Sequence, residues 1–102
     1  MSIRWMRTGQ IKNGRVMEAM AWSMEVCGWV EKKHNIKVHT WMDAVGSLGT
    51  IRWTVDYPDM AAFDKVMTAV NMDPDYHKFV AKAFQGDLFI DGVGVDTLSK
   101  QM

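Results

Sequence analysis

Alternating apolar and polar residues predict four β-strands along the chain. Successive side chains of a strand point to opposite faces, so a period of two is typical of a sheet with one buried face. The segments that show this period are residues 3–11, 36–45, 48–57 and 88–95. Gly46 and Ser47 separate the second segment from the third and predict a β-hairpin. Gly92 and Gly94 loosen the fourth segment.

Apolar positions spaced three to four residues apart predict a helix after the first strand. Asn13 and Gly14 offer its N-terminal cap. The Lys-Lys-His run at residues 32–34 places positive charge where the carbonyl end of a helix favours it, and Asn35 is suited to the left-handed turn that ends a helix. The face expected to be buried consists of Val16, Met20, Ser23, Cys27 and Val30.

A second helical region is expected between the third and fourth strands, in two parts. Pro58 and Asp59 open the first part. Asp73, as an N-cap, and Pro74, at the first helical position, restart the helix, and Gly86 closes it. The expected core positions are Phe63, Val66, Met67 and Val70 in the first part, and Tyr76, Phe79, Val80, Ala83 and Phe84 in the second.

The order strand-helix-strand-strand-helix-strand is that of an α+β domain of the ferredoxin-like type. In this βαββαβ arrangement, a four-stranded antiparallel sheet has two helices on one face. The chain has 102 residues, 48% of them hydrophobic, and no linker-like or low-complexity segment divides it. We therefore expect a single domain over residues 1–102.

The parity of each strand predicts which side chains lie on the sheet face that no helix covers. The residues expected under the helices are Ile3, Trp5, Val38, Met42, Ile51, Trp53 and Val55. Those expected on the uncovered face are Arg4, Met6, Thr8, His39, Trp41, Asp43, Thr50, Arg52 and Thr54. This face is too apolar to be left in water and too polar for an ordinary core. It predicts a homodimer in which two sheets face each other around a polar-lined space.

Charge and cysteine content exclude several classes of protein. Twelve basic residues balance twelve acidic ones, so there is no general positive field for nucleic acid or an anionic membrane surface. Cys27 is the single cysteine, which excludes an intramolecular disulfide and a four-thiolate zinc site. No apolar run suits a signal peptide or a membrane span. We expect a cytoplasmic protein with no membrane or nucleic-acid partner.

Neither a metal site nor a nucleotide cofactor is predicted. The three histidines share no spacing that suits metal ligation. Gly92 and Gly94 lead into no helix, so they do not form a phosphate-binding loop. Cys27 falls on the expected buried face of its helix, where a thiol is typically a small apolar residue and not a nucleophile.

In these features the chain resembles the dimeric α/β-barrel superfamily, and within it the antibiotic-biosynthesis-monooxygenase and NIPSNAP-like group. The residues that carry the resemblance are the strand at residues 51–57 (IRWTVDY), the helix opening Pro58-Asp59, and the restart Asp73-Pro74-Asp75-Tyr76 with Phe79 and Val80 after it. The resemblance covers nearly the whole chain. It implies a dimer whose two sheets form one barrel, with a cavity that in relatives holds a small, often aromatic or polyketide-like molecule. Activities in the group range from cofactor-free oxygenation to isomerisation to no known reaction.

One branch of this group is not matched. Its haem-degrading members resemble each other in an Asn on the first strand and a Trp and a His on the second helix. Here residues 3–11 contain no Asn and residues 60–84 contain no Trp. An alignment on the Asp73 restart places Val80, not His77, at the position of that histidine. Haem cleavage is therefore not expected.

His39 is the candidate catalytic acid or base. Imidazole titrates near neutrality, and the parity of the strand points His39 into the expected space beside Trp41. The alternative is a histidine that only forms hydrogen bonds at a dimer interface. Trp41 is a candidate to stack on a flat ligand, and its alternative is plain packing between the two sheets.

Arg4, Thr8 and Arg52 are the other ligand-binding candidates on this face. Arg4 and Arg52 fall on strands that are adjacent in this fold, where two guanidinium groups would converge on a carboxylate or enolate oxygen. The alternative for both arginines is a salt bridge to Asp43 or Asp91.

Trp22 and Trp29 lie on one stripe of the first helix, away from its expected core face. They indicate a second contact surface unless the edge of the helix–sheet interface buries them.

Three interpretations of function stay open. The first is a small-molecule-binding barrel with cofactor-independent monooxygenase or isomerase chemistry. The second is a non-catalytic ligand-sensing or protein-assembly module that uses an exposed Trp22 and Trp29. The third is a structural dimer whose open face is filled by its own side chains.

Overall fold

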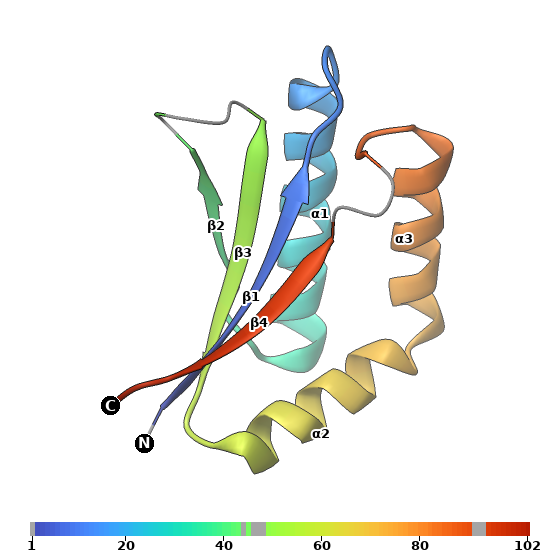
Figure 1. Cartoon of the computed structure of the whole chain (residues 1–102). Coiled ribbons are helices and arrows are strands. Elements are labelled where there is room, and N and C mark those ends of the chain that lie inside the picture. The colour runs from blue at the N-terminus through green and yellow to red at the C-terminus, as the bar shows by residue number, and fades with distance from the viewer. Residues whose placement is uncertain (1, 44, 46–48, 91–93) are drawn as a thin grey trace.

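A sheet packs one of its faces against a layer of helices and leaves the other face uncovered (Figure 1). The computed structural model describes residues 2–43, 45, 49–90 and 94–102. The elements in chain order are β1 (Ile3–Gln10), α1 (Val16–His34), β2 (His39–Met42), β3 (Thr50–Tyr57), α2 (Met60–Asn71), α3 (Pro74–Gln85) and β4 (Val95–Lys100). The strand order is β2-β3-β1-β4, and each neighbouring pair is antiparallel. This is the ferredoxin-like fold that the pattern predicts.

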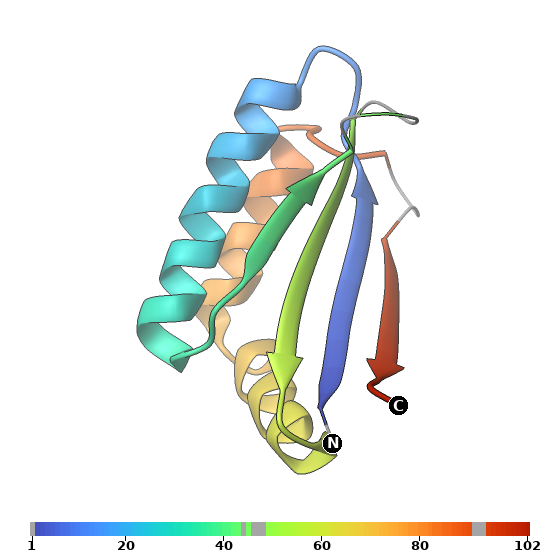
Figure 2. The same ribbon diagram turned by 90° about the vertical axis from the view of Figure 1, so that its left-hand side faces the viewer.

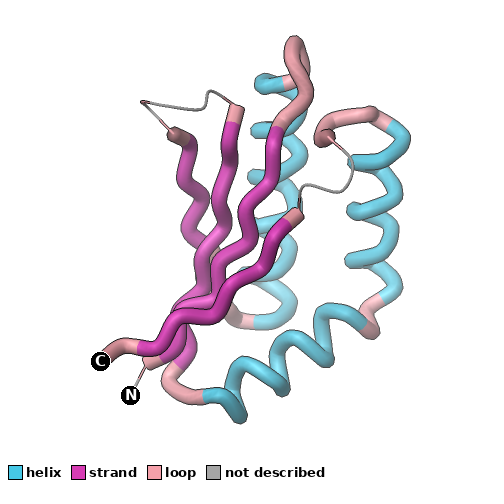
Figure 3. Tube along the Cα trace, in the orientation of Figure 1, coloured by secondary structure: helices cyan, strands magenta, loops and turns pink. Residues whose placement is uncertain are grey.

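The three helices form one layer. Figure 2, turned by 90° from Figure 1, shows α1 and α3 side by side along the sheet, with α2 crossing near the end where the chain termini lie. Figure 3, coloured by element type, shows the same separation of helices and strands. Among the described residues, no helix combines the length and apolar character needed to cross a membrane.

Local side-chain chemistry sets most helix ends where it was predicted to do so. Asn35 adopts φ 55° and ends α1 in a left-handed turn. The Asp59 carboxylate accepts a hydrogen bond from the Ala62 amide at 2.8 Å, and α2 begins there. Asp73 accepts one from the Asp75 amide at 2.9 Å and begins α3. The predicted division of the second helical region is therefore confirmed.

Two expectations about α1 are wrong. Arg15 takes the N-cap position in place of the expected Asn-Gly cap, and no side chain caps this end. Val16 and Met20, expected in the core, are 38% and 40% exposed, whereas Ala19 is fully buried. The helix is rotated so that Trp22 packs toward the sheet, since burying an indole removes more apolar surface from water than burying a methionine.

The core lies where the middle of the sheet meets α1 and α3. Its buried cluster consists of Ile11, Ala19, Ile51, Ala83 and Leu88. Phe84 was expected in this core but is 69% exposed. Ala83 faces the core in its place, because consecutive side chains of a helix point in different directions and residues 83 and 84 cannot share one contact.

The last strand lies further along the chain than predicted. The predicted segment was residues 88–95, but β4 begins at Val95. Gly92 of that segment, and the predicted Gly46-Ser47 turn, lie outside the described residues. Every residue of β4 is exposed, because it is an edge strand that pairs only with β1. Such a strand needs no apolar face, so hydrophobic alternation did not reveal it.

The apolar residues before β4 belong to the core instead. Leu88 is 5% exposed, and its amide donates a hydrogen bond to the Ala83 carbonyl at 3.3 Å. The backbone of Phe89 pairs with that of Ile11, which follows β1, in an isolated β-bridge and not in a strand. This apolar run fills the junction between α3 and the sheet, which explains why it resembled a strand.

The register confirms the predicted faces of the paired strands. Residues directly opposite each other in antiparallel strands share a face. Trp5 opposes Val55 on the side under the helices. On the uncovered side, Arg52 opposes both Thr8 of β1 and Trp41 of β2.

Asp73 ties the end of α1 to the start of α3. Its side chain is 7% exposed and accepts from Lys33 Nζ at 2.8 Å, while His34 Nε2 lies 3.2 Å away. Hydrogen bonding from Lys33 holds the pKa of Asp73 below its ordinary value. The folded state therefore favours the ionised carboxylate.

The interactions of the ionised Asp73 carboxylate predict that the protein loses stability in acid. The stabilisation is complete above the unfolded pKa of about 3.9 and disappears as the pH falls through the lower folded pKa. We expect the melting temperature, followed by circular dichroism, to fall below about pH 4, and Asp73→Asn to flatten part of that fall while keeping an N-cap. Asp64→Asn, at an exposed position of α2, is the matched control. If Asp73→Asn left the pH dependence of the melting temperature unchanged, other carboxylates would be responsible for the acid sensitivity.

Candidate functional site

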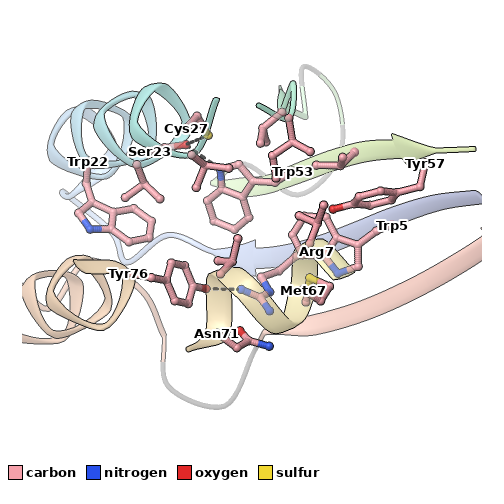
Figure 4. Close-up of a pocket in the computed structure, with 17 residues that line it drawn as sticks. Trp5, Arg7, Trp22, Ser23, Cys27, Trp53, Tyr57, Met67, Asn71 and Tyr76 are labelled. Carbon is pink, nitrogen blue, oxygen red and sulfur yellow. Dashed lines mark hydrogen bonds between the residues drawn. The ribbon is translucent and has the colours of Figure 1, made fainter. Parts of the chain in front are cut away.

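A cavity of about 110 Å³ lies between the sheet and the helix layer (Figure 4). Aromatic side chains form much of its wall, and one guanidinium reaches it. The residues that define its character are Trp5, Arg7, Trp22, Trp53, Tyr57 and Tyr76. They come from β1, β3, α1 and α3, so the cavity exists only when all these elements are packed.

Arg7 is the charged group of this cavity. It follows Trp5 at the same parity of β1, which places it on the helix side of the sheet. Its Nε and Nη2 donate to the two carboxylate oxygens of Asp96 on β4, at 2.7 and 2.9 Å. Its Nη1 donates to the Tyr76 hydroxyl at 2.9 Å, the dashed line in Figure 4. The hydrogen bonds that Arg7 donates to Asp96 raise the pKa of Arg7, so it stays charged.

Trp22 and Trp53 form the apolar wall. Their ring centroids lie 6.3 Å apart in an edge-to-face arrangement. The Trp53 indole N–H donates to the Ser23 hydroxyl at 2.6 Å, and the Trp22 indole N–H donates to the Phe79 carbonyl at 2.9 Å. Because both N–H groups already have protein partners, the two indoles offer mainly apolar ring surface to a ligand.

A second hollow of about 220 Å³ adjoins the first on the side of α3. The residues common to the two are Arg7, Trp22, Trp53 and Tyr76. By comparison, an apolar cavity of roughly 150 Å³ holds one benzene molecule. The two hollows together therefore have room for an aromatic ring and a short substituent.

The expectation of an exposed Trp22 and Trp29 is wrong. Trp22 packs against Trp53 and against Phe89, whose ring centroid is 5.4 Å away. Trp29 packs against Phe79 of α3 at the same centroid distance. Both indoles are half-buried where α1 meets α3 and the sheet, which was the alternative explanation for this stripe.

Part of the predicted site does come together on the uncovered face. His39 and Trp41 have ring centroids 6.5 Å apart on β2. Trp41 lies opposite Arg52, and Arg52 donates to the carboxylate of Asp43 in a salt bridge. That salt bridge is the predicted alternative role for this arginine.

Arg4 and Arg52 do not converge within one chain. Arg4 opposes Asp56, whereas Arg52 opposes Thr8, four residues further along β1. At about 3.4 Å per residue the two arginines lie on the order of 13 Å apart along the strands. Arg4 is paired with Asp56 at 2.8 Å, whereas the suggested Asp43 is paired with Arg52. Asp91 lies outside the described residues.

The sequence analysis did not identify Arg7, Tyr57 or Tyr76 as site residues. One signal was present, because an arginine at the buried parity of a strand requires a partner under the helices. Its partner, Asp96, lay beyond the segment expected to form the last strand. The pair was therefore not recognisable from spacing.

Cys27 lines the cavity but is not activated. Its sulfur lies 4.0 Å from the Ser23 hydroxyl and 3.7 Å from the Thr40 hydroxyl. Burial raises the pKa of the Cys27 thiol, so the thiolate is disfavoured at neutral pH. In the part of the chain that the structure describes, no group of three or more His, Cys, Asp or Glu side chains is arranged to hold a metal ion.

Solved structures with the same fold cover almost the whole chain. An uncharacterized NIPSNAP-like domain protein from Burkholderia xenovorans is 13% identical with a TM-score of 0.81, over 99% of this chain and 85% of that chain. A NIPSNAP family protein from Agrobacterium tumefaciens is 12% identical with a TM-score of 0.78, over 100% and 94% of the two chains. An antibiotic biosynthesis monooxygenase is 13% identical with a TM-score of 0.70, over 98% of each chain. At these identities the likeness concerns the fold.

Sequence comparison supplies the family. No curated protein sequence matches the chain. A sequence model of the NIPSNAP family, in contrast, matches residues 5–98, nearly the full length of the chain. The resemblance suggested by the strand at residues 51–57 and the two helix openings is thus confirmed. This chain belongs to the NIPSNAP family.

Proposed function

We propose that this chain binds a small, largely apolar aromatic molecule in the cavity between its helices and its sheet. The observation that carries the proposal is an aromatic wall formed by Trp22 and Trp53 beside the hydrogen-bonded pair Arg7 and Tyr76. Apolar cavities with a few placed polar groups are the usual form of small-molecule sites. The wall supplies affinity for a ring, and the polar pair orients it.

The cavity favours binding over acid–base catalysis. The ionisable side chains among its described lining residues are Arg7, Cys27, Tyr57 and Tyr76. Arg7, Cys27 and Tyr57 are not ready proton acceptors at neutral pH, because the arginine stays charged and burial raises the pKa of the thiol and of the Tyr57 phenol. The cavity is therefore better suited to binding a small molecule than to catalysing its reaction.

The uncovered face favours a second candidate, a cofactor-independent oxygenase or isomerase. Such chemistry needs a group that takes a proton, and His39 beside Trp41 and Arg52 would supply it there. This candidate depends on a partner sheet that closes the face. An unchanged turnover in His39→Ala, once a substrate is identified, would remove His39 from the mechanism.

We propose that the partner sheet is that of a second copy of this chain. The uncovered face exposes Trp41 by 55% and Val95 by 57%, with the half-buried Met6 between their strands. Apolar groups of this size on an uncovered sheet support a self-complementary interface. The same homodimer is implied by the resemblance to dimeric α/β barrels.

Filling the cavity tests the binding proposal. Val66 lines the cavity from α2, and Val66→Phe is expected to weaken the binding of ethylbenzene at least about tenfold, because the added ring takes the space of the ligand. Val45→Phe adds the same ring at a position that is 91% exposed and is expected to change nothing. Binding is followed by NMR on the indole N–H signals of Trp22 and Trp53. Equal affinity in both variants would place the ligand outside this cavity.

A further inference from the structure

Tyr57 brings an unused hydroxyl to the cavity. It is the last residue of β3 and is 4% exposed, with its ring edge-to-face against Phe63 at 5.4 Å between centroids. Among the described residues its hydroxyl has no hydrogen-bond partner, whereas the hydroxyl of Tyr76 has Arg7. Figure 4 shows the Tyr57 hydroxyl directed inward between the sheet and the helices. Tyr57 lines the cavity, and no fully buried side-chain oxygen among the described residues lacks a partner, so this unpaired hydroxyl is accessible.

Both tyrosine hydroxyls are available as donors. Burial raises the pKa of Tyr57, so its phenol keeps its proton at neutral pH. The Tyr76 oxygen accepts the hydrogen bond from Arg7, which leaves its own proton free to be donated. Two donors at one cavity match an oxygen that only accepts, such as a carbonyl.

Arg7 does not offer a free positive charge to an anion. Two of its three guanidinium nitrogens are bound to the carboxylate of Asp96 in a bidentate pair. A ligand carboxylate would have to lose its water and then lie close to Asp96, with like-charge repulsion. The electrostatics of the pair therefore disfavour an acid as the ligand.

We infer that the ligand is a neutral aromatic carbonyl compound whose oxygen accepts a hydrogen bond from the Tyr57 hydroxyl. This rests on the proposed binding function and adds the ligand class and a specificity-determining residue. The ring would lie against the indole wall. The carbonyl would point to the end of the cavity where Tyr57 lies.

Three probes of nearly equal shape separate this inference from the binding proposal itself. Acetophenone carries a neutral carbonyl, benzoate an anion, and ethylbenzene no polar group. Titrations of the full chain, followed by the same indole N–H signals, are expected to rank acetophenone above ethylbenzene and ethylbenzene above benzoate. Tyr57→Phe removes only the hydroxyl and is expected to weaken acetophenone about threefold to tenfold while leaving ethylbenzene unchanged.

The other outcomes would contradict either the inferred ligand class or the binding proposal itself. Tightest binding by benzoate, or an unchanged acetophenone affinity in Tyr57→Phe, would overturn the inference, and ethylbenzene binding would still support the cavity. Failure of all three probes to bind would overturn both. Met24→Ala, at a position of α1 that is 74% exposed, is the control variant and is expected to leave the affinity for acetophenone unchanged. If it weakened acetophenone as much as Tyr57→Phe did, the effect of Tyr57→Phe would not be specific to the cavity.

Discussion

Trp41→Glu is expected to convert a dimer of this chain into a monomer. Trp41 is 55% exposed on the uncovered sheet face, where its indole N–H donates to the Thr54 hydroxyl at 2.9 Å and its ring stays open to a partner. A carboxylate at the centre of an apolar interface loses the packing and adds an unpaired charge. At interface hot spots such losses are about 2 kcal/mol or more, which weakens association at least roughly thirtyfold.

The measurement is the mass in solution, by native mass spectrometry or light scattering, against a chain mass of 11.7 kDa. The control is Met24→Glu, which places the same charge on the outer face of α1 at a residue that is 74% exposed. It is expected to leave the mass at twice that of one chain. A wild-type protein that is already monomeric, or a Trp41→Glu variant that stays dimeric, would refute an interface on this face.

Leu88→Ala is expected to lower the free energy of unfolding by about 3 kcal/mol, within the range measured when buried leucines are truncated. Leu88 is 5% exposed and packs in the central cluster, although it lies in no strand. For a domain of this size, that loss corresponds to a drop in melting temperature of roughly 15 °C. It would remove a large share of a total stability that is typically about 5–15 kcal/mol.

The matched variant is Leu98→Ala, in the strand that the structure does show. Leu98 is 46% exposed on β4, so its truncation is expected to cost less than about 1 kcal/mol. Urea unfolding of the two variants measures both values at one temperature. If Leu98→Ala proved the more damaging, the last strand would bury more surface than the structure indicates.

Much of the fold could be predicted because it depends on residues that are close together in the sequence. Strand parity identified the paired faces of β1, β2 and β3 because a side chain in a strand has only two directions. Asp59, Asp73 and Asn35 set helix ends because a cap depends on hydrogen bonds or backbone angles within a few residues. The family resemblance used the same segments, so it succeeded for the same reason.

Errors arose where a residue's neighbours come from distant parts of the chain. Leu88 resembled a strand residue because burial in a junction and burial in a sheet select the same apolar side chains. Met20 was placed on the buried face of α1 and Trp22 on a stripe away from it, and only the position of α1 against the sheet shows that Trp22 packs toward the core. Phe84 was placed in the core by its spacing, although the rotation of α3 brings its neighbour Ala83 to the core and leaves Phe84 exposed.

The candidate site shows most clearly which features depend on local sequence and which depend on the packing of distant segments. His39, Trp41 and Arg52 were placed on one face from strand parity, and the structure keeps them there. The ion pair of Arg7 with Asp96 joins residues 89 positions apart, and the Tyr76 hydroxyl comes from another helix. By itself the sequence determined the elements, their faces and the fold class, because these depend on local periodicity and capping. Only the tertiary structure decided which side chains enclose the cavity, because that depends on how separate elements pack.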